Sequence, residues 1–84
     1  MSDLAKTISR NISMVRKEMS FSLQDVADGV GASKSAIHYI ESGRNNITIR
    51  MLEKIATFFG LPVSALISDT LTYGRQRGEN DGTE

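Results

Sequence analysis

The chain has no cysteine and no tryptophan, only one proline, and no net charge over its 84 residues. Without cysteine it can form neither disulfides nor thiolate metal sites, which suits a reducing cytoplasm. No apolar run approaches the roughly 20 residues needed to span a bilayer. The N-terminal sequence MSDLAKTISRN lacks the apolar core of an export signal. The hydrophobic share of 39% is enough for one modest core, so we expect a single small cytoplasmic domain.

The zero net charge by itself argues against a nucleic-acid partner. The charges are unevenly placed, however. Residues 1–67 carry eight basic and six acidic side chains, whereas residues 68–84 carry two basic and four acidic ones. A mildly basic segment is therefore followed by an acidic one, and any binding function must depend on a local surface.

The spacing of apolar residues predicts helices throughout the first 69 residues. In the first segment, intervals of three and four residues predict a helix from about Asp3 to Met19. The apolar positions of this helix are Leu4, Ile8, Ile12, Val15 and Met19.

Two short helices are predicted next, separated by a glycine. Ser22 and Asp25 fit a capping box at the start of the first one, whose apolar face consists of Leu23, Val26, Ala27 and Val30. Gly31 is placed to end this helix, because a sharp turn there needs positive φ. Ser33 is the N-cap of the second helix, which runs to about Ser42 with only Ile37 and Ile40 plainly apolar.

Two further helices complete the predicted bundle. Thr48 is placed to cap a helix that ends at Gly60, with the apolar positions Ile49, Leu52, Ile55, Ala56 and Phe59. Pro62 favours the first turn of a fifth helix, which carries Val63, Leu66 and Ile67. We therefore predict an all-α, compact bundle of about five short helices. The domain covers residues 1–69, and residues 70–84 form a C-terminal segment, a possible dimer arm followed by a disordered tail.

The second and third helices have the features of a helix-turn-helix unit. Ala27 is small enough to let two helices cross closely, Gly31 allows the sharp turn, and Ile37 and Ile40 attach the third helix to the core. A helix buried on so narrow a face keeps most of its surface free. Since an α-helix fits the major groove of DNA, these features predict a DNA-reading unit.

The same stretch resembles a known family. VRKE at residues 15–18, FSLQDVADGVGASKSAIHYIESGRN at residues 21–45 and LEKIATFFGLPVSAL at residues 52–66 resemble the lambda-repressor-like (Xre/Cro-type) helix-turn-helix domains of phage repressors and restriction-modification controller proteins. The resemblance covers about residues 8–67, and it implies a transcriptional regulator of repressor or controller type that acts on DNA at the nucleoid.

The resemblance implies roles for matched positions. Lys34, Ser35 and Tyr39 fall where family members contact base edges, and the exposed His38 lies beside them. Arg16 and Glu41 match a pair that forms a buried salt bridge. The expected phosphate contacts are Ser33, Ser42, Arg44, Asn45, Asn46 and Gln24. Leu23 departs from the family pattern, because glutamine is common there and helps to anchor phosphate; Gln24 or the amides of the helix N-terminus would have to replace it.

Several side chains have a second interpretation. Tyr39 could instead cover the core, and Lys34 and Ser35 could be ordinary solvated residues. The histidine has no nucleophile or metal partner at a suitable spacing, and the chain shows no catalytic or metal-binding motif, cofactor site or effector pocket, so we do not expect an enzyme.

The apolar residues near the C-terminus exceed what so small a core can bury, which predicts a homodimer on a palindromic operator. The expected interface consists of Leu61, Val63, Leu66, Ile67, Leu71 and Tyr73. The alternative is a protein-interaction module of the same fold that does not read DNA, such as an antitoxin.

Overall fold

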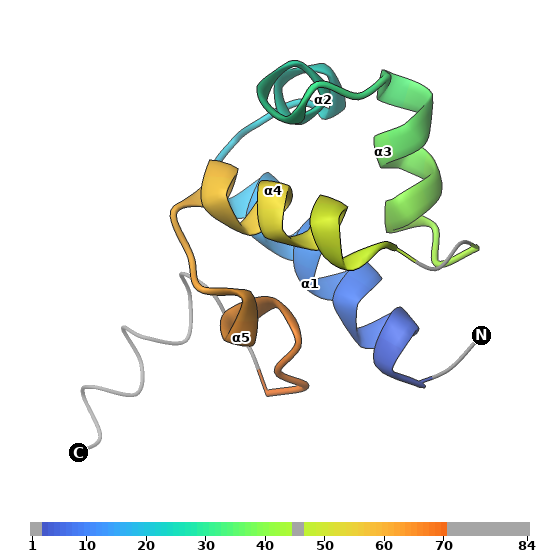
Figure 1. Cartoon of the computed structure of the whole chain (residues 1–84), viewed down its shortest axis with the longest axis vertical. Coiled ribbons are helices and arrows are strands. Elements are labelled where there is room, and N and C mark those ends of the chain that lie inside the picture. The colour runs from blue at the N-terminus through green and yellow to red at the C-terminus, as the bar shows by residue number, and fades with distance from the viewer. Residues whose placement is uncertain (1–2, 45–46, 71–84) are drawn as a thin grey trace.

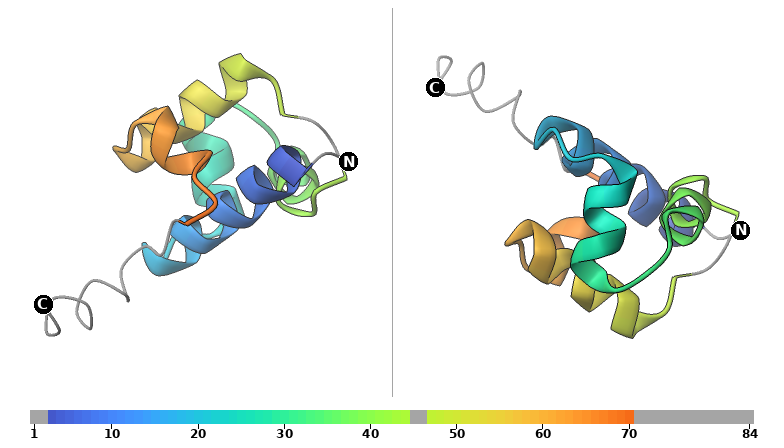
Figure 2. Two further views of the ribbon diagram at one scale, coloured as in Figure 1. Left: turned by 90° about the horizontal axis from the view of Figure 1, so that it is seen from below. Right: turned by 90° about the horizontal axis from the view of Figure 1, so that it is seen from above.

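Five helices follow one another in the computed structural model, which describes residues 3–44 and 47–70 (Figure 1). They are α1 (Asp3–Glu18), α2 (Leu23–Val30), α3 (Lys34–Glu41), α4 (Ile49–Phe59) and α5 (Val63–Leu66). The described residues contain no strand, which confirms the predicted all-α class. Helix α2 lies across α1 and α4, α3 stands at the edge of the bundle, and α5 lies on the other side of α4 from α2 (Figures 1 and 2).

The boundaries of the helices follow from local capping, much as predicted. Ser22 and Asp25 form the capping box of α2, with both reciprocal hydrogen bonds present. Ser33 and Thr48 accept hydrogen bonds from backbone amides in the first turns of α3 and α4. Gly31 adopts φ of 74° at the end of α2, as the sharp turn requires. Because these caps involve residues three or four apart, the sequence alone could predict them.

The turn after α1 is closed without glycine. Ser20 has φ of 63°, which is uncommon for a residue with a side chain. The amide of Ser20 donates to the carbonyl of Lys17, and the amide of Phe21 donates to that of Arg16. This pair of bonds is the Schellman arrangement, and it directs Phe21 back towards the core.

Most of the predicted apolar faces are buried in one core. Its residues are Ile8, Ile12, Val15, Val26, Ala27, Val30, Ile37, Ile40, Leu52, Ile55, Ala56, Phe59 and Leu66. The prediction was wrong for Leu4 and Ile49, which are 55% and 74% exposed. Both lie in the first turn of their helices, where no neighbouring element covers them. Ile67 was expected in the fifth helix but follows α5 as its C-cap, and Pro62 is the N-cap.

A buried asparagine joins α1 to the chain after α5. Asn11 is fully buried, and its Nδ2 donates to the carbonyls of Leu66 at 2.9 Å and Ser68 at 2.7 Å. Its Oδ1 accepts from Arg10 at 3.0 Å. The amide is therefore satisfied on both sides, and it fixes a short segment that has little regular structure of its own. The periodicity of α1 gave no sign of this contact.

Three phenylalanine rings pack together where α2 and α4 meet the turn after α1. The ring centroid of Phe58 lies 4.9 Å from that of Phe21 and 5.8 Å from that of Phe59. Phe58 also lies against the backbone of Gly29 in α2, so closely that a Cβ at Gly29 would be 2.3 Å from the ring. The approach of the two helices here therefore depends on a residue without a side chain.

We predict that Gly29→Ala lowers the free energy of unfolding by about 1–2 kcal/mol, because the Phe58 ring must move away from Phe21. The intrinsic helix preference alone would give a gain of about 0.5–1 kcal/mol. Urea denaturation measures the change. In a Phe58→Ala background the clash is gone, so the same substitution should become stabilising. A gain of stability in both backgrounds would contradict the proposed contact.

Candidate nucleic-acid interface

Helix α3 presents one wide side to solvent at the edge of the bundle (Figure 1). Only Ile37 and Ile40 are buried among its eight residues, and Ala36 is half-buried. The exposed side consists of Lys34, Ser35, His38 and Tyr39. Because positions i, i+1, i+4 and i+5 of a helix share one side, these four side chains form one continuous surface. The structure thus brings all four predicted base-contacting residues together.

The turn between α2 and α3 holds the start of α3 in place. The amides of Gly31 and Ala32 both donate to the carbonyl of Ala27, which closes the end of α2. Ser33 then begins α3 by accepting from the amide of Ala36 at 3.0 Å. No residue in this turn adds a bulky side chain beside Lys34, so the first turn of α3 is open.

An ion pair fixes the other end of α3 to α1. Arg16 Nε donates to Glu41 Oε2 at 2.7 Å and Arg16 Nη2 donates to Oε1 at 3.0 Å, while Nη1 donates to the carbonyl of Phe21 at 2.9 Å. The two side chains are only 13% and 9% exposed. The hydrogen bond that Arg16 donates to Glu41 raises the pKa of Arg16 above its ordinary value, and burial opposes this shift. The pair that the resemblance implies is therefore present, with bidentate geometry.

The polar residues expected at phosphates have different local settings. Arg44 is exposed just after α3. Ser42 Oγ donates to the carbonyl of Tyr39 at 2.6 Å, and Gln24 Nε2 donates to Asp28 Oδ1 at 2.9 Å along α2. Ser33 remains exposed although it caps α3. Asn45 and Asn46 lie outside the described residues.

The residues expected at a dimer interface do not form one exposed surface. Leu66 is 0% exposed because it packs into the core of its own chain, so its assignment to the interface was wrong. Leu61 and Val63 are half-buried and Ile67 is 40% exposed. Leu71 and Tyr73 lie outside the described residues. Ile67 is thus the most exposed of the four described residues of this set.

Within residues 3–44 and 47–70, no helix has the length and apolarity to cross a membrane. The same ranges contain no group of three or more histidine, cysteine or acidic side chains that could hold a metal ion.

Comparison with known proteins agrees with this geometry. The family model described as "Helix-turn-helix" matches residues 12–66, which include α2, the turn and α3. The chain belongs to this helix-turn-helix family. The lambda-repressor-like resemblance is thereby confirmed, and the family is not one of enzymes.

Two relatives show how far the similarity extends. The cryptic phage CTXphi transcriptional repressor RstR of Vibrio cholerae is 33% identical over 64 residues, which are 76% of this chain and 58% of RstR. The HTH-type transcriptional regulator SutR of Escherichia coli K12 is 34% identical over 68 residues, which are 81% of this chain and 38% of SutR. The chain therefore spans a little over half of one relative and less than half of the other.

We predict that Arg16→Ala lowers the free energy of unfolding by about 3–5 kcal/mol, since it leaves the carboxylate of Glu41 buried without a partner. Thermal and urea unfolding measure this loss. In the control, Arg16→Met combined with Glu41→Leu removes both charges and should recover most of the stability. An Arg16→Ala protein that melts like the wild type would show that the pair does not hold α3.

Proposed function

We propose that the protein is a sequence-specific DNA-binding transcriptional regulator of the repressor type, acting in the cytoplasm as a homodimer on a palindromic operator. The observation that carries the proposal is the exposed side of α3, which combines a cation, a hydroxyl, an imidazole and a phenol on one continuous surface. Membership of a helix-turn-helix family and similarity to a transcriptional repressor support it.

The dimensions of α3 suit the major groove. A helix with its side chains is about 10–12 Å across and the groove is about 12 Å wide, so a helix at the edge of the domain can enter it. The first turn of the reading helix usually approaches the bases most closely. Lys34 and Ser35 occupy that turn, and Lys34 can donate to guanine O6 and N7.

Tyr39 and His38 extend the same surface by one turn. Tyr39 is 48% exposed, which supports an outward role over the alternative that its ring covers the core. Its ring can contact a thymine methyl group, and its hydroxyl a phosphate or a base edge. We assign the contacts with phosphates on either side of the groove to Ser33, Ser42 and Arg44, together with the predicted contacts at Asn45 and Asn46.

Gln24 is the proposed substitute for the missing glutamine at Leu23. Its amide nitrogen donates one of its two hydrogens to Asp28, so the other hydrogen can still be donated to a phosphate. The backbone amides at the start of α2 are a further anchor at this corner, because they carry the positive end of the helix dipole.

We predict that selection from a random duplex pool recovers a palindrome, and that Lys34→Ala weakens binding by about 1–3 kcal/mol while relaxing base preference at one position in each half-site. Arg44→Ala should weaken binding to all duplexes alike. It should also reduce the slope of log affinity against log salt by about one. Lys17→Ala, an exposed lysine on α1, is the control. No duplex binding by the wild type at low salt would overturn the proposal.

We predict that Ile67→Asp shifts the protein from dimer to monomer in sedimentation, because a charge replaces the most exposed apolar side chain among the described residues of the expected interface. Ile49→Asp changes an even more exposed apolar residue at the opposite end of α4 and should leave the dimer intact. A wild-type protein that sediments as a monomer at operator-binding concentrations would contradict the dimer.

A further inference from the structure

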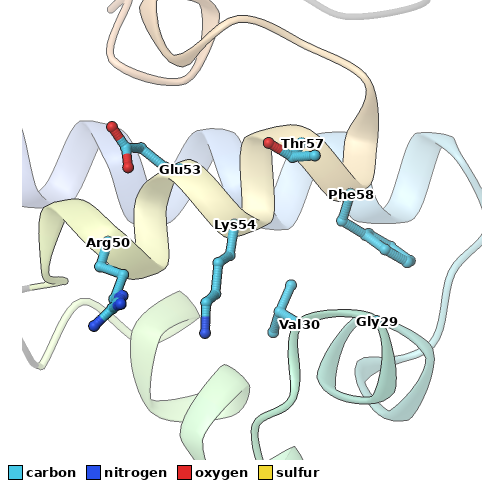
Figure 3. A pocket seen from close by; sticks show the side chains of 7 residues that line it. All are labelled: Gly29, Val30, Arg50, Glu53, Lys54, Thr57 and Phe58. Carbon is cyan, nitrogen blue, oxygen red and sulfur yellow. The ribbon is translucent and has the colours of Figure 1, made fainter.

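Two basic side chains on α4 lie outside every role assigned so far. Arg50 and Lys54 are four residues apart, both are exposed, and both extend from α4 towards the side where α2 and α3 lie (Figure 3). Glu53, the acid between them, lies on the same side of α4 but turns its carboxylate away from both cations (Figure 3). The two cations line a hollow of about 480 Å³ together with Gly29, Val30, Glu53, Thr57 and Phe58.

The stability of the chain does not explain these two cations. Arg50 lies in the first turn of α4, where the helix dipole disfavours positive charge. Like charges four residues apart on a helix repel each other. Among the described residues the one ion pair is that of Arg16 with Glu41, so neither α4 cation is neutralised by an acid there. Each of these features costs a little stability, which favours a role in binding an anion.

The position of α4 points to the phosphates of one DNA strand. The chain passes from the end of α3 at Glu41 through Arg44 into α4 at Ile49, and α4 begins beside that end of α3 (Figure 1). A helix in the major groove has a phosphate strand on each side, so α4 can face the strand that lies beside the end of α3.

We propose that Arg50 and Lys54 are phosphate-binding residues that extend the contact of the 42–44 loop along one strand of the operator. The inference rests on the proposed function, since it assumes that α3 occupies the major groove. It assigns to α4 a strip of positive charge about one helical turn long, which contributes affinity and orientation without reading bases.

The test is the salt dependence of binding by the full chain to its selected operator duplex. Each phosphate contact contributes about 0.9 to the slope of log affinity against log salt. Arg50→Ala and Lys54→Ala should each reduce the slope by about one, and the double variant by about two. One unit of slope corresponds to about a fourfold change in affinity between 50 and 200 mM salt. Base preference in the duplex selection should stay unchanged.

Two controls distinguish direct phosphate contact from an effect of net charge. Lys17→Ala removes one exposed cation from α1, and Glu18→Gln removes one exposed acid from the same helix. Neither should alter the slope if the effect arises from direct contact. Ethylation of individual phosphates should interfere with wild-type binding at positions where it no longer affects the double variant.

The outcomes are distinguishable from failure of the proposed function. If the wild type binds no duplex at low salt, the function itself fails. If the wild type binds, but the double variant keeps the same slope and the same ethylation pattern, the assignment of Arg50 and Lys54 is wrong. Equal loss of slope in Lys17→Ala and Lys54→Ala would also overturn it. Thermal melting confirms that the variants remain folded.

Discussion

The bidentate pair between Arg16 and Glu41 is the contact on which the exposed surface of α3 depends. The guanidinium joins α1, α3 and the turn after α1, because its third nitrogen donates to the carbonyl of Phe21. An eight-residue helix is not stable alone, and α3 buries only Ile37 and Ile40 fully. A polar contact at its end therefore fixes its direction without widening its buried face. It also neutralises a carboxylate that would otherwise repel phosphate.

The opposite end of α3 is positioned by backbone geometry instead. Gly31 turns the chain through positive φ, and the Ser33 cap begins α3 three residues after the end of α2. Close crossing of α2 over α4 needs a further small residue, Gly29, which lies beside the Phe58 ring. The Phe58 ring and the absence of a side chain at Gly29 are thus two halves of one packing contact, and a side chain at position 29 fits only if the ring moves or is made smaller.

The sequence predicted features that depend on residues close in the chain. The N-caps, the glycine turn and the apolar periodicity each depend on residues within three to seven positions of one another. The predicted helices therefore end close to where the structure ends them. Prediction from the sequence failed where the burial of a residue depends on which helices pack against each other. Leu66 faces the core of its own chain because α5 packs on α1 and α4, and Asn11 is buried because the chain after α5 crosses it. Leu4 and Ile49 continue apolar stripes past the point where a neighbour covers them. For the surface of α3, periodicity identified the exposed residues, but the orientation of Arg50 and Lys54 required three dimensions.

The zero net charge becomes compatible with DNA binding once the acids of α2, α3 and α4 are placed. Asp25 accepts from the amide of Ser22 in the capping box, and Glu41 is paired with Arg16. Asp28 accepts from Gln24, and Glu53 turns its carboxylate away from Arg50 and Lys54. Acids near the proposed interface are thus used in local structure or point elsewhere, whereas the cations Lys34, Arg44, Arg50 and Lys54 are all exposed. Exposed charges are screened beyond about 10 Å at 0.1 M salt. A phosphate at this surface is therefore attracted by these nearby cations far more than it is affected by the net charge of the chain. A chain with no net charge can therefore have a locally positive surface.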